Sequence, residues 1–130
     1  MDKNFYITTP IYYPSAKPHM GHAYSSIIAD FFARFKIIDD YKVHFLTGTD
    51  EHGLKIQRSA ERAGESPQKF CDQISKTFRD LSDTLNLCNT DFIRTTEDRH
   101  KNTVQYLWSE LEKNDDIYLS NYSGWYSVSD

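Results

Sequence analysis

The stretch that most constrains the fold runs from Thr9 to His22, T-P-I-Y-Y-P-S-A-K-P-H-M-G-H, and it contains three of the four prolines of the chain. Proline fixes φ and disfavours helix at the residue before it, so this stretch stays extended until His19. The preceding segment, Asn4 to Thr9, is rich in β-branched and aromatic residues and predicts a short buried strand. The sequence therefore predicts a strand that passes into a helix through an extended loop.

The tetrapeptide His19-Met20-Gly21-His22 falls on the first turn of the expected helix. Free backbone N–H groups and the positive end of the helix dipole suit a polyphosphate there. Both imidazoles can donate hydrogen bonds, and Gly21 lacks a Cβ, so a flat ring or a phosphate can approach the backbone closely. A bare H-x-G-H is common, however, and the alternative is an ordinary loop with two solvated histidines.

Apolar residues recur at steps of three and four from Met20 to Ile38, which predicts a helix of about five turns. Asp39-Asp40 is expected to end it. Aromatic stripes of this kind are far more often core than cofactor contacts, so we expect the stripe to be buried. Its members are Ile27, Ile28, Phe31, Phe32, Phe35 and Ile38.

The segment from Val43 to Thr47 predicts a second strand. A strand, a crossover helix and a strand of this length imply parallel pairing with a right-handed crossover, which is half of a mononucleotide-binding fold. The polar loop T-G-T-D-E-H-G, residues 47–53, follows this strand. Ligands bind outside the carboxyl ends of adjacent strands in such sheets, so this loop is expected to lie beside the His19 turn and form the site.

Two further helices are predicted next in the chain. The first spans Leu54 to Ala63 and ends at Gly64 as its C-cap. The second begins with Ser66 as N-cap and Pro67 at the first helical position. The buried face of this second helix is expected to carry Phe70, Ile74, Phe78, Leu81 and Leu85.

A brief third strand is expected at residues 92–95. Thr95 with Asp98 has the form of a capping box, which would open a helix whose inward face carries Val104, Leu107, Trp108 and Leu111. From Ile117 to Val128 the pattern becomes aromatic and alternating, which predicts a hairpin or a bulged strand. An aromatic edge left unpaired at Asp130 is unusual, so we expect the sequence to be cut inside a domain, with residues 1–115 in one domain and 116–130 opening another.

Composition limits the remaining possibilities. The 130 residues suffice for a core, and 38% hydrophobic with 15% aromatic residues exclude disorder. A net charge of −4 neither supports nor excludes an RNA partner. No apolar run approaches a membrane span and no targeting presequence is visible, so we expect a soluble cytoplasmic protein. Cys71 and Cys88 form no C-x-x-C pair, which indicates buried thiols rather than a zinc knuckle or a disulfide.

Taken together, these motifs resemble those of the methionyl-tRNA synthetases, a family of class I aminoacyl-tRNA synthetases. The H-x-G-H element alone is shared by all class I synthetases and by several nucleotidylyltransferases, whereas the T-G-T-D-E-H-G loop with I-Y-Y upstream points to methionine. The resemblance runs along nearly the whole chain. It is carried by residues 8–14 (T-T-P-I-Y-Y-P), 18–24 (P-H-M-G-H-A-Y), 45–53 (F-L-T-G-T-D-E-H-G) and 91–96 (D-F-I-R-T-T).

The resemblance implies a Rossmann-like catalytic domain that forms methionyl-adenylate from ATP, with Mg²⁺, and methionine, and then transfers the methionyl group to the terminal adenosine of tRNA(Met). It implies that His19 and His22 are catalytic donors to the ATP phosphates, which act through positioning and charge stabilisation. It further implies that Pro10, Tyr12 and Gly21 contribute to ATP binding.

The resemblance also implies a methionine pocket formed by Ile11, Tyr13 and Asp50, whose carboxylate would pair with the α-ammonium group. A thioether suits aromatic and aliphatic walls. The alternative role for Asp50 is a turn former that caps the next helix. A metal site at Asp50, Glu51 and His52 is disfavoured, because adjacent loop residues seldom point at one ion.

Two features depart from the family pattern. The K-M-S-K-S signature, whose lysines hold the triphosphate, is absent from these residues, so we expect a fragment that is inactive alone. Many relatives begin a zinc knuckle where this sequence has Ser127 and Asp130, so no zinc is expected there. The remaining alternatives are a nucleotidylyltransferase of the H-x-G-H type and a non-catalytic nucleotide-binding fragment.

Overall fold

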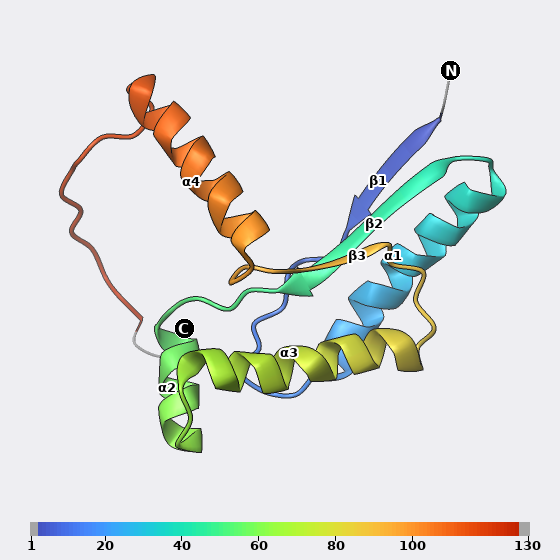
Figure 1. The fold of residues 1–130 in the computed structure, drawn as a ribbon, viewed down its shortest axis with the longest axis horizontal. Helices are drawn as coiled ribbons and strands as arrows, with labels where there is room; N and C mark the ends of the chain where they lie inside the picture. Colours follow the sequence, from blue (N-terminus) through green and yellow to red (C-terminus); the bar gives the residue numbers. More distant parts are fainter. Residues whose placement is uncertain (1–2, 128–130) are drawn as a thin grey trace.

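The chain is an α/β structure built on a parallel sheet (Figure 1). A computed structural model describes residues 3–127. The elements in chain order are β1 (Asn4–Thr8), α1 (Met20–Ile38), β2 (Lys42–Thr49), α2 (Leu54–Ala63), α3 (Pro67–Thr84), β3 (Asp91–Arg94) and α4 (Asp98–Lys113). The predicted strands and helices up to Lys113 are thus all present, with small differences in their ends.

The three strands are parallel and lie in the order β1-β2-β3. Thr8 of β1 is opposite Leu46, and Thr49 at the end of β2 is opposite Arg94. The predicted parallel pairing of a strand, a helix and a strand is confirmed. All three strands therefore present their carboxyl ends at one edge, where the loops that follow them meet.

Helix α1 packs on the sheet through small side chains. Its buried residues are Ser26, Ala29 and Ala33, and the two alanines form a core cluster with Phe45 of β2. The prediction that the aromatic stripe of α1 is core is wrong, because all six of its members are exposed, and Ile38 reaches 83%. The Phe45 ring fills the space between helix and sheet, so only alanine fits opposite it, and the larger residues lie on the sides of α1 that no described element covers.

Helix α3 lies across the carboxyl end of the sheet, and its predicted buried face is largely confirmed. Phe78 is 2% exposed and forms a second core cluster with Tyr12 and Phe92, against which Ile74 packs. Phe70 is also buried. This second cluster places the core directly beneath the first turn of α1, which carries His22.

The local signals at the junction between α2 and α3 are confirmed. Gly64 closes α2 in the left-handed region with φ of 70°, and the Ser66 hydroxyl accepts a hydrogen bond from the Lys69 N–H. The predicted capping box of Thr95 and Asp98 is wrong. Glu97 is the N-cap of α4, and its side chain accepts no hydrogen bond from the helix backbone. The Thr95 hydroxyl instead accepts from the backbone N–H of Glu51.

Helix α4 projects away from the sheet (Figure 1), and none of its residues is buried. The inward face predicted for it is therefore wrong: Val104, Leu107, Trp108 and Leu111 are each 43–56% exposed. The strand or hairpin predicted at residues 117–128 is also not found in its described part, because residues 117–127 contain no strand and are exposed apart from the half-buried Ile117. No described strand lies beside them to supply partners, and Val128 lies outside the described residues.

Candidate active site at the carboxyl ends of the strands

The two histidines of the H-x-G-H turn cap the helix that they open. The Gly21 N–H donates to Nδ1 of His19, and the His19 N–H donates to Nδ1 of His22, each at 3.1 Å. A neutral imidazole whose Nδ1 accepts carries its proton on Nε2. Both rings can therefore donate from Nε2 to a ligand, while two of the N–H groups expected to be free are already satisfied by the rings themselves.

The surroundings of the turn favour the neutral form of the His22 imidazole. The rings of His19 and His22 lie 3.9 Å apart between centroids. Burial, together with the neighbouring His19, lowers the pKa of His22 below its ordinary value. A Cβ on residue 21 would lie 2.9 Å from the His19 ring, so glycine at this position leaves room for the capping imidazole as well as for a ligand.

Tyr12 is buried beneath this turn. Its hydroxyl is 2.8 Å from the Ser25 Oγ and 3.0 Å from the Ser26 Oγ, and its ring contacts His22 edge-on at 4.8 Å. The ring also stacks on Phe78. With 8% of its surface exposed, Tyr12 is placed to hold α1 and His22 in position.

The loop after β1 continues alongside β2 and orients the remaining predicted residues. The Tyr12 N–H donates to the Gly48 carbonyl, and the Tyr12 carbonyl accepts from the Asp50 N–H, both at 2.9 Å. Since side chains alternate along extended backbone, Ile11 and Tyr13 lie on the opposite side from the buried Tyr12, and both are exposed. Pro10 is exposed as well.

Asp50 stands at the end of β2 with a free carboxylate. It is half-buried, and no described group bonds to its side chain. The alternative role as a cap is not supported, because the N-cap of α2 is Gly53 and receives no side-chain bond. Asp50 is thus joined through the backbone of Tyr12 to the histidine turn, with its charge available to a ligand.

Glu51, next in the chain, belongs to a buried polar network that sequence reasoning missed. Its fully buried carboxylate accepts from Arg94 at 2.7 and 2.9 Å, from Thr49 at 2.7 Å and from Thr96 at 2.5 Å. Burial alone would raise the pKa of Glu51, but these bonds outweigh it and lower the pKa. Arg94 also bonds to Asp72 at 2.6 Å. No pairing of the second and third strands was predicted, and only the structure places Glu51 and Arg94 at their adjacent ends.

Of the three residues considered as a metal site, two have partners of their own. Glu51 bonds to Arg94, while Nδ1 of His52 lies 3.0 Å from the Thr95 hydroxyl. Among residues 3–127 no group of three or more potential ligands is suited to a metal ion. The expectation of no zinc at Ser127 and Asp130 remains a prediction, because Asp130 lies outside the described residues.

The fold and site define a class: a parallel sheet whose first helix opens with an H-x-G-H turn. The sequence model of the family described as tRNA synthetases class I (M) matches residues 5–130. The chain therefore belongs to this family of class I tRNA synthetases, and the Rossmann-like fold expected for it is confirmed.

Individual proteins that are similar to this chain carry names that match the family. The chain is 55% identical to the methionine–tRNA ligase of Listeria monocytogenes serovar 1/2a over 130 residues, which cover 99% of this chain and 20% of that protein. It is 53% identical to the mitochondrial methionine–tRNA ligase of Takifugu rubripes, covering 99% of this chain and 22% of the relative. The chain thus spans about a fifth of the length of these relatives.

A solved structure shows the same fold. The methionyl-tRNA synthetase of Mycobacterium tuberculosis in complex with methionyl-adenylate superposes with a TM-score of 0.93 at 48% sequence identity, over 97% of this chain and 25% of that one. No helix in the described part of the chain is long and apolar enough to cross a membrane.

Proposed function

We propose that this chain is the part of a methionine–tRNA ligase that binds the ATP phosphates and the methionine ammonium group. The observation that carries the proposal is the arrangement around Tyr12. On one side its ring supports His22, and on the other its carbonyl accepts the N–H of Asp50 at 2.9 Å. Two Nε2–H donors and one unpaired carboxylate are thereby held at the carboxyl ends of adjacent strands, where a triphosphate and an ammonium group need them.

Each residue has a distinct task in adenylate formation. The methionine carboxylate attacks the α-phosphorus of ATP, bound with Mg²⁺, and pyrophosphate leaves. His19 and His22 donate from Nε2 to phosphoryl oxygens, whose negative charge grows in the transition state. Asp50 pairs with the methionine ammonium, while the exposed Ile11 and Tyr13 form part of the wall around the substrate. Tyr12 is a positioning residue, and Pro10 keeps the loop extended toward the nucleotide.

The second half-reaction transfers the methionyl group to tRNA(Met). We propose that residues 1–115 are the N-terminal half of the catalytic domain and that 116–130 begin a connective domain. The K-M-S-K-S lysines are not among these residues, so the isolated chain should not charge tRNA. We place the protein in the cytoplasm, with the mitochondrial relative from Takifugu rubripes indicating the alternative location.

Replacing Asp50 tests the proposal in the full-length protein. Asp50→Asn keeps the shape but removes the charge, so it should weaken methionine binding by about 3 to 5 kcal/mol, the cost of breaking a desolvated ion pair from one side. ATP binding should change little, and the preference for methionine over an analogue without the amine should be lost. Calorimetric titration with each ligand measures these affinities.

Asp39→Asn is the matched control, because Asp39 is the C-cap of α1, at the far end of that helix from His19. The control should bind methionine as the unmodified protein does. Normal methionine binding by a folded Asp50→Asn variant would show that the pocket is assigned to the wrong residue.

A further inference from the structure

Three side-chain hydroxyls meet beneath the turn that carries His22. The Tyr12 hydroxyl lies 2.8 Å from the Ser25 Oγ and 3.0 Å from the Ser26 Oγ. Ser26 is 3% exposed and Tyr12 is 8% exposed, so these groups must satisfy each other with little help from water. Ser26 lies one helical turn after His22, so the two residues share a side of α1. Neither serine has a role in the adenylate chemistry proposed above.

The protons of this cluster can be assigned one after another. The Ser25 hydroxyl donates to the carbonyl of His22 at 3.1 Å, so its oxygen accepts from Tyr12. Within the described part of the chain, the Ser26 hydroxyl bonds to Tyr12 alone, so its buried proton goes to the Tyr12 oxygen. The donors thus form one directed chain, which begins at Ser26, passes through Tyr12 and ends at the backbone of His22. Hydrogen bonds in such a chain polarise and strengthen one another.

This chain of hydroxyls holds the aromatic ring that supports the His22 imidazole. The Tyr12 ring contacts His22 edge-on at 4.8 Å between centroids, and Phe78 of α3 contacts it edge-on at 5.1 Å. Phe78 also stacks on Tyr12 at 5.5 Å, but an apolar stack of this kind resists sliding of the rings only weakly. The hydrogen bonds at the hydroxyl end of Tyr12 fix the ring against such sliding. The direction of the Nε2–H of His22 therefore depends on the bonds that the Tyr12 hydroxyl makes.

We infer that Ser26 is a positioning residue for adenylate formation, which acts through the Tyr12 hydroxyl on the direction of the His22 Nε2–H donor. The inference rests on the proposed function, because that function makes His22 a donor to the phosphoryl oxygens. A preorganised donor stabilises the transition state only when it is aimed at the place where charge grows. Ser26 produces this effect without touching a ligand.

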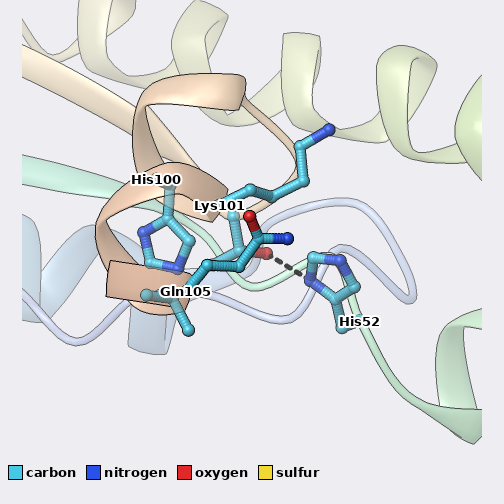
Figure 2. A pocket seen from close by; sticks show the side chains of 6 residues that line it. His52, His100, Lys101 and Gln105 are labelled. Atoms are coloured by element: carbon cyan, nitrogen blue, oxygen red, sulfur yellow. Dashed lines mark hydrogen bonds between the residues drawn. The ribbon is translucent and has the colours of Figure 1, made fainter. Parts of the chain in front are cut away.

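The methionine side of the site has a separate support. The Asp50 N–H donates to the Tyr12 carbonyl, and the Tyr12 N–H donates to the Gly48 carbonyl, both at 2.9 Å. These backbone bonds remain when a side-chain hydroxyl is removed. The open hollow between the loop after β2 and α4, shown in Figure 2, is also unaffected, because neither serine of the cluster lines it. Loss of the Ser26 hydroxyl should therefore lower kcat and leave the KM for methionine unchanged.

The test measures methionine-dependent ATP–pyrophosphate exchange by the full-length protein with Ser26→Ala. The kcat should fall about fivefold, the rate equivalent of one ordinary hydrogen bond. Ser75→Ala is the matched control, because Ser75 is 1% exposed and its Oγ lies 3.1 Å from the Thr49 hydroxyl. The control loses a buried bond of the same kind on α3, away from Tyr12, and should keep the kcat of the unmodified protein. Urea unfolding confirms that each variant is folded under the assay conditions.

Two double variants show whether Ser26 acts through its neighbours. Tyr12→Phe removes the hydroxyl in the middle of the chain and should lower kcat by at least as much as Ser26→Ala does. Adding Ser26→Ala to Tyr12→Phe, or to His22→Ala, should lower the rate no further, because the interaction has already been lost. A residue with a merely structural role would instead lower the rate by the same factor in every background.

Four outcomes would overturn the role of Ser26. They are an unchanged kcat in Ser26→Ala, a rise in the KM for methionine in place of the fall in kcat, an equal fall in kcat in Ser75→Ala, and a further loss in either double variant. Absence of exchange by the unmodified full-length protein would instead contradict the proposed function.

Discussion

At the scale of single residues, Glu51 shows how a charge is retained inside this fold. Its carboxylate accepts from Arg94, Thr49 and Thr96, and its side chain is fully buried. A buried carboxylate is tolerated only when it is paired and its remaining lone pairs are occupied, and both conditions are met here. Because Arg94 is the last residue of β3, this pair ties the carboxyl ends of β2 and β3 together and fixes the loop that presents Asp50.

Glu51→Gln should destabilise the chain by about 3 kcal/mol, because it leaves the guanidinium of Arg94 without its buried counter-charge. Urea unfolding followed by circular dichroism measures the loss. Asp80→Asn is the control: it removes a surface pair with Lys76 and should cost less than about 1 kcal/mol. Equal losses in the two variants would contradict a stabilising buried pair.

The lowered pKa of Glu51 adds a pH signature to the same experiment. The contribution of a carboxyl with a depressed pKa is fully present above its ordinary value of 4.5 and is lost as the pH falls below it toward the folded-state pKa. The unmodified chain should therefore lose stability in acid more steeply than Glu51→Gln does.

At the scale of elements, the contact between β2 and β3 depends on Gly48. A Cβ at this position would collide with the carbonyl oxygen of Ile93 and lie 2.7 Å from its Cγ2. The two strands could then no longer pair in the register that sets Gly48 opposite Ile93. The glycine is thus needed for the close approach that brings Glu51 to Arg94.

Gly48→Ala should destabilise the chain by about 3 kcal/mol or more, since backbone atoms cannot move aside as a flexible side chain does. Gly64→Ala is the comparison, because its left-handed φ of 70° costs an alanine roughly 1 to 2 kcal/mol without any collision. Thermal unfolding of both variants shows which substitution lowers the stability more. A smaller loss for Gly48→Ala than for Gly64→Ala would show that β3 can shift freely.

At the scale of the whole molecule, a large apolar face of α1 is left uncovered by the described elements. Phe31 is 65% exposed and Phe35 is 54% exposed, and their neighbours in the stripe are exposed as well. Contiguous apolar surface of this kind mediates association. The isolated 130-residue chain therefore has a surface that favours contact between copies.

Sedimentation of the chain at increasing concentration should show association that weakens when Phe31 and Phe35 are both changed to serine. The unfolding free energy should change little, because neither ring belongs to the two core clusters. Changing the exposed Tyr118 and Tyr122 to serine is the control and should leave association unaltered. An equal effect of the control pair would mean that association does not depend on α1.

Local structure was determined by the sequence alone. The prolines before His19, the glycine after α2, and Ser66 with Pro67 act on the backbone within a few residues of themselves. The start of α1, the end of α2 and the start of α3 could therefore be read without the fold. The order of strands and helices also indicated parallel pairing, and with it the edge of the sheet where the loops after β1 and β2 lie.

Only the tertiary structure decided which surfaces are buried and which polar groups pair. Periodicity marked α1 as amphipathic, but the ring of Phe45 selected Ala29 and Ala33 as its packed face. Glu51 and Arg94 are far apart in the chain, so no local signal could report their bond. The packing of Tyr12 against Phe78 and the start of α1 is likewise a contact between distant segments that the sequence did not indicate. Such contacts depend on the positions of distant segments, which only the folded chain brings together.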